Sequence, residues 1–190
     1  MKIKYLFYIS QNYSFEILRP IQNEIWANGD LCAWFVEGDE VNLNNFATNE
    51  NLLGTIKEAI LFSPDVVFVP GNLVPDFISG LKVQVFHGLE WKKQGHFKIR
   101  GCFDLYCTHG ELTTQRFNQL TQKHGYFKVV ETGWPKLDPL FATPAYELST
   151  DLPVILFAPT FSPNLTCAVE CLEEIKKLVD HCLEYATELL

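Results

Sequence analysis

The residue of this sequence best suited to acid–base chemistry is His87, in the stretch VQVFHG at 83–88. An imidazole gains and loses a proton near neutral pH, so it can act as a general base. The glycine that follows, Gly88, permits a tight turn and a close approach of a ligand to the backbone. His109 stands in a similar THG stretch and is a second candidate. The alternative, that either histidine only hydrogen-bonds the end of a strand, is open at this point.

A basic run follows His87 in an otherwise acidic chain. It contains Lys92, Lys93, Lys98 and Arg100, whereas the formal net charge of the chain is −8. Such a run could hold a phosphate or guide an anionic acceptor toward the histidine. A solvated loop would have the same composition, so both interpretations remain.

The cysteines and the local motifs exclude several kinds of chemistry. Cys102, Cys107 and His109 do not have the spacing of a zinc site, and we expect no metal and no cofactor. All six cysteines are expected to be reduced thiols. The sequence has no GxGxxG, Walker A, HExxH or GxSxG motif, which disfavours dinucleotide binding of the usual kind, P-loop hydrolysis, zincin chemistry and α/β-hydrolase chemistry.

The elements that must position these residues are short, continuously apolar strands that alternate with amphipathic helices. This pattern is typical of a parallel sheet covered on both faces, and it predicts a doubly wound, Rossmann-like α/β domain over residues 1–141. The predicted strands are Lys4–Ile9, Leu31–Val36, Asp65–Val69, Lys82–Phe86, Phe103–Cys107 and Phe127–Val130, and the predicted helices are Phe15–Trp26, Asn51–Leu61 and Glu111–Lys123.

In open parallel sheets, ligands bind beyond the carboxyl ends of the strands. Polar and glycine-containing loops follow the predicted strands, and we expect them to converge at one edge of the sheet. The substrate-binding candidates at these strand ends and in the basic run are Gln11, Asn12, Gly71, Asn72, Gly88, Lys92, Lys93, Lys136 and Asp138.

The chain changes character after residue 141. Residues 142–152 have the small and polar composition of a linker, and residues 153–190 contain a predicted strand, Pro153–Ala158, and a long helix, Thr166–Leu190. A single strand–helix unit cannot bury both of its faces alone. We therefore expect the start of a truncated second domain, or a helix that packs on the first domain or on a second copy of the chain.

The amino-acid composition limits which binding partners and which cellular location we expect for this protein. The chain is 47% apolar, 20% charged and acidic overall, so general attraction to nucleic acid or to an anionic membrane is not expected. No apolar run approaches the length of about 20 residues that a membrane span needs, and the N-terminal KYLFYI favours a first strand over a signal sequence. We expect a cytoplasmic protein, with peripheral contact at the inner face of the membrane as an open alternative.

Three segments occur in a set order: VQVFHG with its lysine-rich continuation, TGWPKLDPLF at 132–141, and PVILFAPTFSP at 153–163. They resemble the HG-x-x-x-K, TG[YF]P-x-x-D and ILYAPT segments of the CDP-glycerol glycerophosphotransferases, which build teichoic-acid-type polymers of the cell envelope on a two-domain GT-B fold. The resemblance covers nearly the whole chain and about the first half of such an enzyme. Leu89-Glu90-Trp91 stands where the family element usually has HGT followed soon by lysine.

The resemblance implies that His87 is the general base. It would deprotonate an acceptor hydroxyl, which attacks the β-phosphate of CDP-glycerol, or of another nucleotide-activated donor, and expels CMP. The acceptor would be a hydroxyl compound or a polyol phosphate, and Thr160 and Ser162 would contact the donor phosphates. The family's second histidine and its D-x-S-S segment have no counterpart here, so we expect the transferase to be incomplete in this chain.

Two other functions remain open from the sequence. One is a non-catalytic α/β binding or assembly module. The other is a GT-B domain with different chemistry, such as sugar-nucleotide epimerisation or glycosyl transfer.

Overall fold

The structure of the chain is a computed structural model that describes residues 2–88, 95–142 and 168–188. The chain divides into two compact units, Met1–Ala145 and Tyr146–Leu190. The first unit holds the sheet and the strand-end loops, and the second is described as a single helix.

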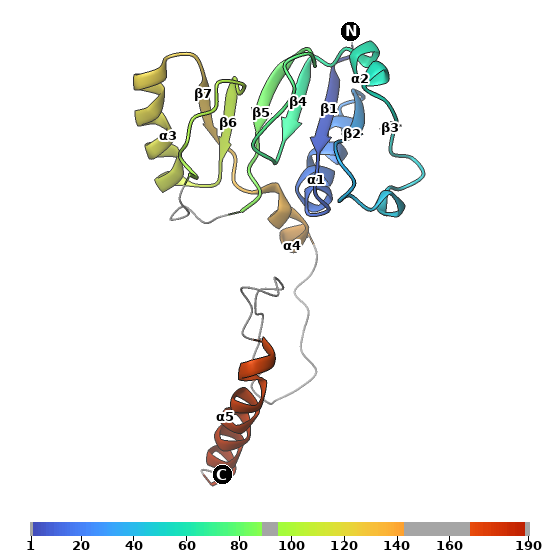
Figure 1. The fold of residues 1–190 in the computed structure, drawn as a ribbon. Helices are drawn as coiled ribbons and strands as arrows, with labels where there is room; N and C mark the ends of the chain where they lie inside the picture. Colours follow the sequence, from blue (N-terminus) through green and yellow to red (C-terminus); the bar gives the residue numbers. More distant parts are fainter. Residues whose placement is uncertain (1, 89–94, 143–167, 189–190) are drawn as a thin grey trace. The chain divides into compact units, whose positions relative to one another are not determined.

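A seven-stranded, all-parallel sheet forms the middle of the first unit (Figure 1). Its order is β3-β2-β1-β4-β5-β6-β7, and the predicted doubly wound, Rossmann-like α/β fold is confirmed. In β1, Leu6 and Phe7 are both fully buried although they point to opposite faces, because both faces of the sheet are covered at this strand. The strands are β1 (Lys4–Ile9), β2 (Leu31–Val36), β3 (Leu52–Leu53), β4 (Val66–Val69), β5 (Leu81–Gln84), β6 (Leu105–Thr108) and β7 (Lys128–Glu131).

Helices cover the two faces of the sheet. On one face α1 packs through Ile17 and Leu18, both fully buried, and on the opposite face α2 and α3 pack through Ala59 and Phe117. The predicted helices Phe15–Trp26 and Glu111–Lys123 agree with α1 and α3 to within one residue at each end. The helical segments of this unit are α1 (Ser14–Ala27), α2 (Ile56–Phe62), α3 (Glu111–His124), α4 (Asp138–Ala142) and the 3₁₀ turns η1 (Leu43–Asn45) and η2 (Pro135–Leu137).

The predicted helix Asn51–Leu61 is wrong at its start. Leu52–Leu53 is the edge strand β3, paired with β2, and the helix begins only at Ile56. A capping box sets this start, because the Thr55 hydroxyl accepts from the Glu58 N–H and the Glu58 carboxylate accepts from the Thr55 N–H, both at 3.2 Å.

A buried carboxylate, Glu50, joins α1 to the segment that precedes β3. Its side chain is 1% exposed and accepts hydrogen bonds from Arg19 Nε at 2.9 Å, Gln22 Nε2 at 3.0 Å and the Ala47 N–H at 2.8 Å. Gln22 also accepts from the Trp34 indole N–H at 2.6 Å. Burial by itself would raise the pKa of Glu50, but these hydrogen bonds and the charge of Arg19 hold that pKa below its ordinary value.

The second unit is described as one helix, α5 (Ala168–Glu188). Two ion pairs along its exposed side, Glu173–Lys176 at 3.0 Å and Glu174–Lys177 at 2.9 Å, have helical spacing. The predicted strand Pro153–Ala158 lies outside the described residues. Among the helices that the structure describes, none combines the length and the apolar character that crossing a membrane requires.

Candidate functional site

The order of the sheet reverses between β1 and β4, since β2 and β3 lie on one side of β1 and the remaining strands on the other. Ligands of open α/β sheets bind outside the carboxyl ends of the strands at such a switch point. The loops at 10–13 and 70–72, which follow β1 and β4, frame this position. His87 follows β5, the next strand along, so it lies beside the switch point.

The imidazole of His87 is the meeting point of three strand-end loops. Its Nδ1 lies 2.9 Å from the carbonyl oxygen of Pro70, which follows β4. A carbonyl oxygen only accepts hydrogen bonds, so Nδ1 carries a proton in this pair. The ring of Tyr13, which follows β1, lies against the imidazole with centroids 5.3 Å apart and planes at 30°. The His87 side chain is otherwise exposed.

The chain turns sharply just before His87. The predicted strand reached Phe86, but β5 ends at Gln84, and Phe86 has a φ of +56°. This left-handed conformation is rare for a bulky residue and costs about 1–3 kcal/mol, which the surroundings must offset. The buried Phe86 ring is held by the rings of His96, His109 and Phe117, with centroid distances of 5.1, 5.5 and 5.3 Å. The packed ring therefore holds the turn that aims His87 at the switch point.

Two further histidines lie beside this turn, and both have a pKa below the ordinary value of a histidine. Burial lowers the pKa of His96, and the charge of His87 lowers it further. Burial also lowers the pKa of His109, with a partial offset from its contact with the Val85 carbonyl, 3.4 Å from Nε2. His96 is half-buried, because the turn that carries it folds back over Phe86.

Trp134, in the loop after β7, extends the aromatic lining. Its ring lies 5.5 Å from that of His109, and the Nζ of Lys136 lies 5.7 Å from its centroid. The buried Nε1 of Trp134 has no hydrogen-bond partner among the residues described. Lys136 also pairs with Glu16 of α1 at 2.5 Å, which ties the loop after β7 to the first helix.

Gln11 and Asn12, predicted to bind substrate, lie at the expected edge but bond to the loop after β2. Gln11 Nε2 donates to the Glu40 carboxylate, and Asn12 Nδ2 donates to the Glu40 carbonyl at 3.0 Å. Asn12 Oδ1 accepts from the Asn42 N–H at 2.9 Å. In this arrangement both side chains hold a neighbouring loop, and a ligand would have to compete for them.

The other predicted substrate-binding residues divide into two groups. Gly71, Asn72 and Gly88 lie at the carboxyl edge of the sheet. Asp138 begins α4, directly after the 3₁₀ turn η2 that contains Lys136. A Cβ on Gly88 would meet no described atom within 4 Å, so the packing of the described residues does not itself require glycine there. Lys92, Lys93, Thr160 and Ser162 lie outside the described residues.

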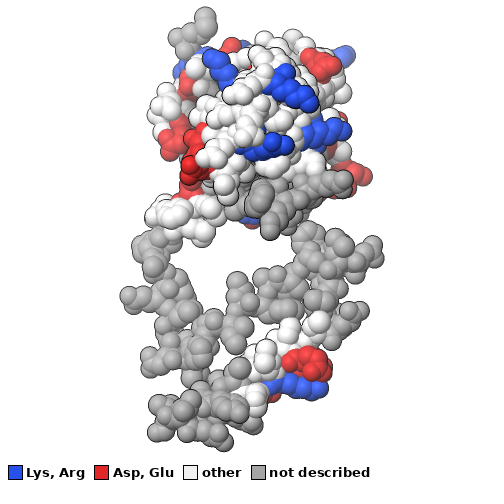
Figure 2. Space-filling model, turned by 90° about the vertical axis from the view of Figure 1, so that its left-hand side faces the viewer, with Lys and Arg blue, Asp and Glu red and all other residues white. Residues whose placement is uncertain are grey.

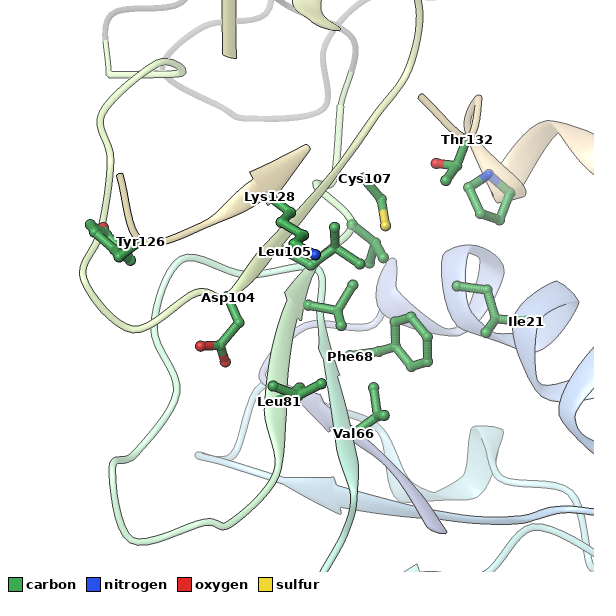
Figure 3. A pocket seen from close by; sticks show the side chains of 13 residues that line it. Ile21, Val66, Phe68, Leu81, Asp104, Leu105, Cys107, Tyr126, Lys128 and Thr132 are labelled. Carbon is green, nitrogen blue, oxygen red and sulfur yellow. The ribbon is translucent and has the colours of Figure 1, made fainter. Parts of the chain in front are cut away.

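A groove runs along the sheet face that α1 only partly covers (Figure 3). Its volume is about 730 Å³, and side chains of β4, β5 and β6 line it together with Ile21 of α1. Phe68, Leu105 and Cys107 point into it. Burial raises the pKa of the Cys107 thiol to about 11, so it is protonated at neutral pH and poorly suited to nucleophilic catalysis.

Charge is distributed unevenly over the first unit. Figure 2 shows the side that carries α3 and β7, where lysine and arginine side chains lie in separate patches among uncharged surface and acidic groups.

Among the described residues, no three histidine, cysteine or acidic side chains are placed to hold a metal ion.

A comparison with models of known protein families finds no match. A comparison with curated proteins gives no significant match either.

Four residues of the site were missed by reasoning from the sequence: Tyr13, Gln84, His96 and Trp134. Gln84 offered a signal, since it is a polar residue inside an apolar strand and such residues are buried at a cost. Tyr13 directly follows the polar loop Ser10-Gln11-Asn12, and Trp134 lies inside the loop that begins at Thr132. An aromatic side chain at such a strand end was the signal that could have indicated them.

Proposed function

We propose that this chain is the acceptor-side part of a CDP-glycerol glycerophosphotransferase-like protein, with His87 as the general base. The fold is consistent with the first domain of a GT-B enzyme, and the three resembling segments supply the substrate class. The proposed donor is CDP-glycerol or another nucleotide-activated donor, and the acceptor is a hydroxyl compound or a polyol phosphate.

The observation that carries the proposal is the pairing of His87 Nδ1 with the Pro70 carbonyl at 2.9 Å. Because Nδ1 carries the proton, the neutral imidazole has its lone pair on Nε2, on an exposed side chain beside the switch point. A general base needs this combination of a fixed ring, a free lone pair and access to substrate.

The proposed reaction is a phosphoryl transfer. Nε2 of His87 takes the proton of the acceptor hydroxyl while the oxygen attacks the β-phosphorus of CDP-glycerol. The bond between that phosphorus and the bridging oxygen breaks, and CMP leaves with the electron pair. The product is a glycerol phosphodiester of the acceptor, and the imidazolium then releases its proton to water. Transfer of this kind depends mostly on positioning and on stabilisation of charge.

The test is release of CMP by the full chain from CDP-glycerol, with glycerol 3-phosphate as acceptor. His87→Gln removes the base and should lower the rate by about 10²–10⁴-fold, the usual contribution of general base catalysis. His124→Gln is the matched control, since His124 is also exposed but ends α3 at the opposite edge of the sheet. It should leave the rate unchanged.

Equal rates for the wild type and His87→Gln would refute the role of His87. Calorimetric titration with CDP-glycerol and CMP separates the remaining functions. No CMP release together with no heat of binding would mean that the chain is an acceptor-side part without a donor pocket of its own, or a non-catalytic binding or assembly module. Binding of a UDP-sugar in place of CDP-glycerol would favour epimerase or glycosyltransferase chemistry.

A further inference from the structure

Gln84 is an unusual residue for its place in the fold. It ends β5 inside the sheet, and only 1% of its surface is exposed. Its Nε2 donates to the carbonyl of Gly71 at 2.6 Å and lies 3.4 Å from the carbonyl of Pro70. Its Oε1 has no hydrogen-bond partner among the described residues. A buried amide with one unpaired atom is costly, so it needs a structural or functional reason.

Gln84 and His87 share one hydrogen-bond acceptor, the carbonyl oxygen of Pro70. Pro70 O accepts from His87 Nδ1 at 2.9 Å and lies within reach of Gln84 Nε2, and a carbonyl oxygen has lone pairs for two donors. Gln84 also holds Gly71, the next residue, so both carbonyls of this turn are held from inside the sheet. The pairing of Val85 N–H with Val69 O, at 3.1 Å, fixes the start of the same turn.

We propose that Gln84 is a positioning residue that keeps the Pro70 carbonyl against His87 Nδ1 and so makes Nε2 the basic nitrogen. In water the neutral imidazole prefers the opposite tautomer, with the proton on Nε2, so the protein must impose this state through the second nitrogen. The inference rests on the proposed role of His87 as a base, but the tautomer can be measured without any substrate.

The experiment is a long-range ¹H–¹⁵N correlation spectrum of the full chain labelled with ¹⁵N-histidine, recorded at a pH where the imidazoles are neutral. The His87 signals are assigned from their loss in His87→Gln. In the wild type, Nδ1 should appear as the protonated nitrogen and Nε2 as the unprotonated one. Relative to free imidazole in water, the ratio of the two tautomers should be shifted toward the form protonated on Nδ1 by about fivefold to tenfold, as one net hydrogen bond provides.

Gln84→Met keeps the length of the side chain and removes both donors, so the ratio should fall toward an even mixture or reverse. Gln84→Asn, which is too short to reach Gly71, should act in the same direction and provides a second variant if one fails to fold. Gln115→Met is the matched control, because Gln115 is exposed on α3 and, among the described residues, its side chain donates to Glu111 at 3.0 Å. It should leave the His87 signals unchanged.

A wild-type His87 protonated on Nε2 would overturn the inference, and so would a folded Gln84→Met with an unchanged tautomer ratio. These results are independent of the transfer assay. A tautomer that depends on Gln84 would support the positioning role even if no CMP were released. A His87-dependent release of CMP with no dependence of the tautomer on Gln84 would refute this inference alone.

Discussion

Replacing Gly80 with alanine should destabilise the first unit strongly, although Gly80 lies far from His87 at the amino edge of the sheet. Gly80 precedes β5 and has a φ of +88°. A Cβ built there would lie 2.4 Å from the carbonyl oxygen of Pro64 and 2.7 Å from the carbonyl carbon and oxygen of Asp65. All three atoms belong to the backbone, so no side chain can rotate to make room.

Two terms add to the loss. The left-handed conformation costs an alanine about 1–2 kcal/mol, and the displacement of packed backbone costs about 1–3 kcal/mol more. The sum is about 2–5 kcal/mol, which for a protein of this size lowers the melting temperature by about 5–20 °C. Denaturant unfolding monitored by tryptophan fluorescence would measure the free energy of unfolding directly.

Gly29→Ala is the control that separates the two terms. Gly29 follows the C-cap residue of α1 and has a φ of +76°, but a Cβ there would meet nothing within 4 Å. This variant should lose only the conformational term, about 1–2 kcal/mol. If both variants lose the same free energy, the close approach of Gly80 to the Pro64–Asp65 backbone does not contribute, and the reasoning is refuted.

Three further predictions concern titratable groups. Because the pKa values of His96 and His109 are lowered on folding, the unfolded chain binds more protons, and the free energy of unfolding should fall as the pH drops below the unfolded pKa of about 6.5. Urea titrations from pH 7.5 to 5 would measure this dependence. His96→Leu should show a shallower slope of the free energy of unfolding against pH, and a slope equal to that of the wild type would contradict the prediction. The Cys107 thiol, with a pKa of about 11, should react with iodoacetamide at least about 10-fold more slowly than free cysteine. Peptide mass mapping over time would measure this rate, and labelling as fast as that of free cysteine would contradict the burial of the thiol. Glu50→Ala should lower the free energy of unfolding in urea by about 2–4 kcal/mol, because it leaves Gln22 without its acceptor and Arg19 without its counter-ion. A decrease below about 0.5 kcal/mol, typical of surface positions, would show that this hydrogen-bond network does not stabilise the fold.

The arrangement of strands and helices could be predicted from the sequence because it depends on local patterns. A continuously apolar stretch such as LCAWFV is recognisable as a strand buried on both faces, and the structure has β2 at Leu31–Val36 as predicted. Amphipathic spacing likewise located α1 and α3. The alternation of the two patterns then predicted a parallel sheet, and the connections of a parallel sheet bring all strand-end loops to one edge. His87 was therefore assigned to the correct edge.

The sequence did not predict what each side chain at that edge would contact, because those contacts join segments distant in the chain. The Asn12 side chain accepts a hydrogen bond from the N–H of Asn42, thirty positions later, and the His87 ring bonds to the carbonyl of Pro70, seventeen positions earlier. The left-handed turn at Phe86 depends on rings from the connection after β5 and from α3, which no local pattern reports. Local periodicity determines which residues are buried, and only tertiary packing decides which atoms face one another. For this reason the sequence determined the sheet and the edge that carries the histidine, whereas the tertiary structure alone decided which nitrogen of that histidine faces the Pro70 carbonyl.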